Sequence, residues 1–293
     1  MDQWPSLPYD EWRPTRDTLH MYLQVVGKLR VALSPFEPQW GHVPFYVTAR
    51  GLTTSPVPSE LRTFDAEFDL VGHELVVRTS DGATERRPLG GDVADFYGDV
   101  TAILDRLGVA ARITPTPQEV DEPIPFPDDH THGTYVAAQA SRFFRVLSMV
   151  DVVMKEHRAP FRGKTTPVQF FWGTFDLALT RFSGREVQPP PGSGLLRRVG
   201  GDAEQICCGW WSGDVRTRQP AFFAYGYPSA EGIENAAVRP EGASWSERAG
   251  EFILPYDAVR EAVDPRRRIH EFMESTYEET ARLMGWPPEL MSR

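Results

Sequence analysis

The sequence contains almost no cysteine. Its two cysteines, Cys207 and Cys208, are adjacent in a chain of 293 residues. Neighbouring residues of a strand point to opposite faces of a sheet, and a disulfide between them would be strained. A zinc site built from several cysteines would need more of them. The cysteine content therefore argues against a structural disulfide and excludes a multi-cysteine zinc site.

Long hydrophobic runs are also missing. No stretch approaches the roughly 18 apolar residues that a membrane-spanning helix needs. Residues 1–5 have neither the basic nor the apolar segment of a secretory signal. We therefore expect a cytoplasmic protein with no membrane partner.

Positive charge is in deficit, with 41 acidic side chains against 31 lysines and arginines and a formal net charge of −10. Nucleic acids are usually bound through a basic patch. The run of three arginines at 266–268 follows Asp264 and Pro265 at an expected helix start, which is typical of a solvated helix face. We expect no nucleic-acid partner.

Common catalytic motifs are absent as well. The chain has no Walker loop, no G-x-G-x-x-G after a strand, no H-E-x-x-H and no G-x-S-x-G. The nearest approach to a metal signature is His130-Thr131-His132, which lies beside two aspartates and lacks a third ligand. A solvated loop is the simpler interpretation of that segment, and no metal ligand is assigned.

Hydrophobic periodicity predicts helices and strands in both parts of the chain. Helices are expected over 18–33, 93–107, 138–157 and 265–284, and an irregular arm over 4–14. Strands are expected over 42–48, 63–70, 74–79, 168–180, 204–211 and 221–227.

Residues 114–129 are rich in proline and acidic side chains and read as a linker. Pro35-Phe36 and residues 43–46 match Pro160-Phe161 and residues 168–171 at a constant offset of 125. An internal duplication is therefore one hypothesis. The expected fold is α+β, with two tandem α-β-β-β-α halves (1–124 and 125–293), antiparallel sheets that could join into one, and a cleft between the halves.

A polar stripe interrupts the first expected helix. His20, Gln24 and Lys28 stand four residues apart, which stacks them on one side of a helix that is apolar nearly all round. Because burying an unpaired charge costs free energy, the stripe either lines a wet cleft or lies on an exposed face. The sequence leaves both possibilities open.

His42 and Arg50 bracket the strand expected after that helix. Arg50 is followed by three hydroxyl residues at 53–55. A guanidinium with nearby hydroxyls can hold an anion, but a hydrogen-bonded loop explains the same pattern.

Asp176 is an acid inside the apolar stretch 168–180. Strict alternation would place Gln169 on one face of a single strand and Trp172 with Asp176 on the other, unless Gly173 breaks it. A buried carboxylate needs a partner, and Arg181 and Arg185 are close in sequence. Asp176 is therefore either half of a structural ion pair or a general acid or base.

The stretch 204–211 combines Glu204, two thiols and two indoles. No spacing supplies a base for a nucleophilic cysteine, so inert buried thiols are expected. Trp172 and Trp210 suit a pocket for a flat ligand and equally suit a core.

Four stretches resemble a bacterial protein family of this length that has no known function. They are 18–28 (TLHMYLQVVGK), 42–58 (HVPFYVTARGLTTSPVP), 170–185 (FFWGTFDLALTRFSGR) and 251–259 (EFILPYDAV). The resemblance covers nearly the whole chain and brings no activity, cofactor or catalytic residue with it.

The same resemblance implies histidine at the position of Gln169. It also implies a His-Glu pair and two serines where this chain has Ala203-Glu204 and Cys207-Cys208. If those histidines carry metal or acid–base chemistry, this chain has lost or altered it. If they are structural, the difference has no catalytic meaning, and the residues leave both interpretations open.

These observations favour an enzyme that acts on a small organic molecule, anionic or aromatic, without nucleotide or flavin and with or without a metal ion. The alternative is a non-catalytic protein that binds a small molecule in an aromatic cleft, and a structural protein ranks third. The sequence identifies no cofactor and no oligomeric state. The expected catalytic residues are His20, His42, Asp176 and Glu204, and the expected substrate contacts are Gln24, Lys28, Arg50, Gln169, Trp172, Arg181 and Trp210.

Overall fold

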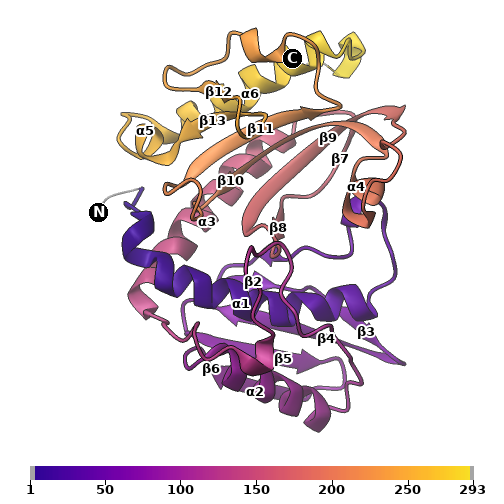
Figure 1. Cartoon of the computed structure of the whole chain (residues 1–293), viewed down its shortest axis with the longest axis vertical. Coiled ribbons are helices and arrows are strands. Elements are labelled where there is room, and N and C mark those ends of the chain that lie inside the picture. Colours follow the sequence, from indigo (N-terminus) through magenta and orange to yellow (C-terminus); the bar gives the residue numbers. More distant parts are fainter. Residues whose placement is uncertain (1–3, 291–293) are drawn as a thin grey trace.

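Two antiparallel sheets, one from each part of the chain, form the framework of the protein (Figure 1). The computed structural model describes residues 4–290. The α+β class with antiparallel sheets is therefore confirmed. The sheets have six and seven strands, more than the three per half expected from the sequence, because strands of two or three residues carry too little periodicity to be recognised.

The N-terminal sheet is flanked by two long helices, α1 (Tyr9–Leu33) and α2 (Val93–Arg106). The short helix η1 (Pro38–Trp40) follows α1. The strand order of the N-terminal sheet is β1 (Tyr46–Val47), β2 (Gly51–Thr53), β4 (Arg62–Asp69), β5 (Glu74–Thr79) and β6 (Thr84–Pro88), with β3 (Val57–Ser59) also paired to β4.

The C-terminal sheet packs on α3 (Ala137–Arg158) and α6 (Pro265–Leu283). Its strand order is β12 (Ser244–Ser246), β13 (Glu251–Pro255), β11 (Ala221–Tyr227), β10 (Ala203–Trp211), β9 (Asp176–Glu186) and β7 (Lys164–Thr165), with β8 (Gln169–Phe171) also paired to β9. Shorter helices are η2 (Phe126–Asp128), α4 (Leu195–Gly200), η3 (Ile233–Asn235), α5 (Tyr256–Arg260) and η4 (Pro288–Leu290).

Helix starts that carry an aspartate cap agree with the sequence. Asp92 accepts a hydrogen bond from the Asp95 amide, and Asp264 accepts one from the Arg267 amide, as capping residues do. The irregular arm expected over 4–14 is wrong for most of its length, because α1 begins at Tyr9. Pro14 lies inside this helix, where it removes one backbone donor without ending it.

The stretch 168–180 is not one strand, and this corrects the face assignment made from strict alternation. β8 and β9 form a hairpin in which Gln169 pairs with Ala178 and Phe171 pairs with Asp176. Directly opposed residues point to the same side of a sheet. Gln169, Phe171 and Asp176 therefore share one face, and the turn that reverses the chain includes Phe175 at a φ of 60°.

The two sheets stay separate and meet at one isolated bridge. Phe45 and Phe170 exchange two backbone hydrogen bonds of 2.8 Å, and these residues are related by the offset of 125 seen in the sequence. The expectation that the sheets join into one is therefore wrong beyond this contact.

Helix α1 crosses the middle of the molecule between the two sheets (Figure 1). It contacts α2 and β3 on one side and α3 on the other. Almost every residue from Thr15 to Arg30 is buried, which explains why the helix is apolar nearly all round. Within residues 4–290, no helix is both long enough and apolar enough to cross a membrane.

Candidate functional site

A cavity of about 840 Å³ lies on the face of the C-terminal sheet that α3 and α6 leave uncovered. Successive side chains of β10 point to opposite faces of the sheet. Gln205, Cys207 and Trp211 line the cavity, whereas Trp210 stacks on Phe143 of α3 on the other face. The volume falls within the range of small-molecule sites. The sheet therefore provides a floor wide enough for a ligand of drug size.

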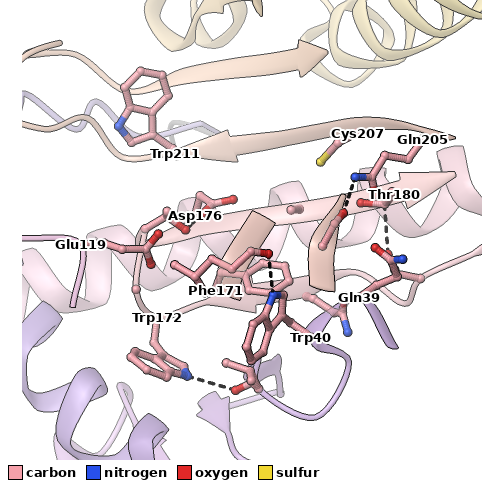
Figure 2. Close-up of a pocket in the computed structure, with 18 of the residues that line it drawn as sticks. Gln39, Trp40, Glu119, Phe171, Trp172, Asp176, Thr180, Gln205, Cys207 and Trp211 are labelled. Carbon is pink, nitrogen blue, oxygen red and sulfur yellow. Dashed lines mark hydrogen bonds between the residues drawn. The ribbon is translucent and has the colours of Figure 1, made fainter. Parts of the chain in front are cut away.

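Aromatic rings form much of the wall. Figure 2 shows Trp40, Phe171, Trp172 and Trp211 around the cavity, and they come from η1, β8, the following turn and β10. Trp40 donates from its indole nitrogen to the Leu196 carbonyl over 3.1 Å, which ties η1 to α4 at the rim.

Asp176 begins β9 and points into the cavity. Its carboxylate accepts a hydrogen bond from the Thr174 hydroxyl in the hairpin turn. Burial is the main cause that raises the pKa of Asp176 to about 7; the Thr174 hydrogen bond opposes this shift and the charge of Glu119 adds to it. At neutral pH this carboxyl is therefore divided between its acid and base forms.

Two further carboxyl groups face the same space. Glu251 begins β13, and burial together with the charge of Asp176 raises its pKa to about 7. Glu119 keeps much of its surface open, but desolvation still raises its pKa. Figure 2 shows Glu119 beside Asp176 at one end of the cavity. No ion pair joins any of the three to a cationic side chain in the part of the chain that the structure describes.

Glu119 reaches this position because Gly173 has no side chain. A Cβ on Gly173 would lie 2.0 Å from Oε2 of Glu119. The glycine of the hairpin turn therefore allows the linker carboxylate to approach the sheet closely.

The thiol of Cys207 and the phenol of Tyr225 lie between the carboxyl groups. Burial raises the pKa of the Cys207 thiol. The pKa of Tyr225 is raised well above its usual value, first by Cys207 and then by burial. Both groups are neutral at physiological pH, and a neutral thiol is a poor nucleophile. The expectation of an inert thiol agrees with this environment.

The whole chain, over residues 4–293, matches the model of a family described as a family of unknown function, DUF5996. The chain belongs to the DUF5996 family. No curated protein and no solved structure matched it. The cavity must therefore be interpreted from the residues of this chain.

Two members of the polar stripe of α1 hold the cavity wall in place from behind. His20 donates from Nε2 to the Gly173 carbonyl over 2.9 Å. Burial lowers the pKa of His20 to about 3, and the charge of Arg16 contributes, so the ring is neutral. Gln24 donates to the Gln118 carbonyl over 2.7 Å and accepts from the Gln118 amide over 2.8 Å. These contacts fix the turn and the linker that carry Asp176 and Glu119.

Trp172 is positioned by a glycine of the same helix. A Cβ on Gly27 would lie 2.5 Å from three atoms of the Trp172 ring. The indole lies against the helix backbone and donates to the Val43 carbonyl over 3.0 Å. Gly27 is thus required by close approach.

Of the residues expected from sequence to form a site, Gln169, Trp172 and Asp176 line the cavity of the DUF5996 protein. His42 is buried between the rings of Phe36 and Trp40 outside it. Lys28 is also buried outside it, and burial lowers its pKa.

The remaining expected residues have partners elsewhere. Arg50 pairs with Asp69 over 2.5 Å, and Glu204 pairs with Arg185 over 3.2 Å. Arg181 lies on the helix-facing side of the sheet, where it donates to the His157 carbonyl over 2.6 Å. Neither Arg181 nor Arg185 is the partner of Asp176, because the hairpin directs Asp176 to the opposite face from Arg181. Trp210 is a core residue on that same far face.

Sequence reasoning did not find Glu119, Tyr225 or Glu251. Glu119 was hidden in an acidic linker, where a carboxylate is expected to be solvated. The alternation of residues 251–255, with Phe252 and Leu254 buried, places Glu251 on the other face of a strand. That pattern was the one available signal.

Of the positions at which the family resemblance implies other residues, Gln169 and Cys207 line the cavity, whereas Ala203 and Cys208 do not. Glu204, the residue that the resemblance does imply, lies outside the cavity as well. Within residues 4–290, no three histidine, cysteine or acidic side chains are arranged to hold a metal ion.

Proposed function

We propose that this protein is an enzyme that moves protons on a small aromatic molecule held in the cavity, with Asp176 as the general acid or base. The observation that supports this most is the convergence of Asp176, Glu119 and Glu251 on one cavity without a cationic partner among the described residues. Carboxyl groups in such surroundings hold protons at neutral pH and can exchange them with a bound molecule.

The three groups suit different roles. Asp176 and Glu251 interact, so their protons are lost in steps that belong to the pair. One carboxyl can then be protonated while the other is ionised, which supplies an acid and a base to the same cavity. Cys207 and Tyr225 stay neutral and are available as hydrogen-bond donors.

An aromatic ligand is favoured by the rings that line the cavity. Trp40, Phe171, Trp211 and Phe223 come from four separate elements and line the cavity together with the carboxyl groups. The same rings are compatible with the alternative function, a protein that binds a small molecule without changing it.

The test combines binding with proton exchange. Small aromatic molecules are screened for binding to the purified protein, and the ligands found are incubated with it in D₂O while exchange of their C–H protons is followed by NMR. We expect exchange with the wild type and a loss of at least about 100-fold with Asp176→Asn, the usual scale of an acid–base residue. Glu204→Gln, a carboxylate variant outside the cavity, is the matched control and keeps full exchange.

Equal binding to wild type and Asp176→Asn, with no exchange or turnover in either, would identify the protein as the non-catalytic binder instead.

We add two inferences, one on the cellular compartment and one on the origin of the two halves. We take the cytoplasm as the compartment, from the sequence alone. We also infer an ancient duplication, supported by the offset of 125 and by the pairing of Phe45 with Phe170 at equivalent positions.

A further inference from the structure

The charge of the cavity wall is one-sided. Asp176, Glu119 and Glu251 line it, and Asp214 lies at its edge with its carboxylate bound to the amides of residues 216 and 217. No lysine, arginine or histidine is among the described residues that line the cavity. A negatively charged ligand would therefore meet carboxyl groups and no cationic side chain among these residues, which opposes the expectation of an anionic substrate.

The aromatic rings of the cavity also favour a positively charged ligand. The face of an indole or phenol ring is electron-rich and attracts cations within about 6 Å of its centre. Trp40, Trp211 and Tyr225 offer such rings from three elements, η1, β10 and β11. Carboxylates among aromatic rings form the usual environment for an organic cation.

Gln169 provides a separate indication of a polar ligand. Its side chain is 3% exposed and faces the cavity, yet its one polar contact is a long 3.5 Å approach to the Tyr46 hydroxyl. No described residue donates a hydrogen bond to its carbonyl oxygen. This oxygen is therefore available to accept a hydrogen bond from a ligand N–H.

We propose that the ligand of the cavity is an organic ammonium ion attached to an aromatic body, with its charged nitrogen held by the carboxyl groups of Asp176 and Glu251 and a separate N–H of the ligand donated to Gln169. This inference depends on the cavity being the ligand site of the proposed function but does not depend on catalysis. An organic cation fits better than a metal ion because no described group of three ligands is placed to hold a metal.

Binding of an organic cation should release protons from the carboxyl groups of the cavity. The groups that face Asp176 are Glu119 from the linker, Glu251 from β13, Cys207 from β10 and Tyr225 from β11, and none of them is cationic. A bound ammonium ion stabilises the ionised carboxyl groups, so it displaces protons that the free protein holds. Affinity for the cation should rise as pH increases from about 6 to 8.

The test uses matched aromatic probes that differ in charge. Benzylamine, phenethylamine and tryptamine are compared by calorimetry with the corresponding alcohols and carboxylates at pH 7, in buffers of different ionisation enthalpy. We expect at least one amine to bind at least ~10-fold more tightly than its alcohol, with release of about one proton, and no binding of the carboxylates. Asp176→Asn and Glu251→Gln should each reduce amine affinity ~10-fold or more and leave alcohol affinity within about twofold.

Glu204→Gln is the control and should bind like the wild type. If one cavity variant does not fold, the other carries the comparison. Equal affinity for amine and alcohol, tighter binding of a carboxylate, binding without proton release, or failure of every amine to bind at roughly 10 mM would overturn the inference. Amine selectivity without D₂O exchange contradicts the proposed catalysis alone, whereas exchange without amine selectivity contradicts this inference alone.

Discussion

Asp176 lies in surroundings that are unusual for an aspartate. A partly buried carboxyl group with no cationic neighbour in the described chain loses solvation without compensation, and this raises its pKa to about 7. The unfolded chain would ionise near the ordinary value of 3.8. Between these two values the folded protein binds more protons than the unfolded chain, so this group makes stability fall as pH rises.

Asp176→Asn removes the free-energy cost of ionising this buried carboxyl group. We expect the variant to be more stable than wild type, with an advantage about 1–2 kcal/mol larger at pH 8 than at pH 5.5, because the charge to be buried grows over this interval. Urea unfolding at the two pH values measures the difference. Glu204→Gln should follow the wild-type pH dependence, and an Asp176→Asn advantage that stays constant or shrinks with pH would contradict the assignment.

At the scale of elements, the long helices and well-alternating strands could be predicted from sequence. The capped helices α2 and α6 and the strands β5 and β11 agree closely with the pattern. The β8–β9 hairpin could not be predicted, because continuous apolar residues hide a chain reversal. Its turn places Asp176 on the same face as Gln169, which the alternation of a single strand does not predict.

The fit of α1 against that hairpin turn can be tested at Gly27. Gly27→Ala places a methyl group on the Trp172 ring, and we expect a loss of about 1–3 kcal/mol of stability, as for overpacked cores. Gly98→Ala in α2 is the matched control, because a Cβ there meets nothing within 4 Å. That variant should gain about 0.5–1 kcal/mol from helix propensity. Thermal unfolding of both variants measures the contrast, and equal effects would contradict the close packing of Trp172.

At the scale of the whole molecule, the cavity is assembled from distant parts of the chain. The C-terminal sheet provides the floor, η1 and the end of α1 provide one wall, and the linker adds Glu119. Sequence alone does not place a linker over a sheet, so the candidate site could be predicted only in part, through Gln169, Trp172 and Asp176. His20 and Gln24 of the polar stripe of α1 neither line the cavity nor lie on an exposed face, because they contact the backbone behind the cavity wall. The boundary between residues 124 and 125 stays a prediction.

The assembled cavity holds carboxyl groups that no cationic side chain in the described chain neutralises. The most direct measurement is a titration of the free protein with aspartate labelled with ¹³C at Cγ, followed by NMR, with the Asp176→Asn spectrum to assign the signal. We expect the carboxyl group of Asp176 to titrate with a pKa of about 7. A midpoint near or below the ordinary value of 3.8 would mean that the carboxylate is compensated, and would contradict both the acid–base role and the cation site.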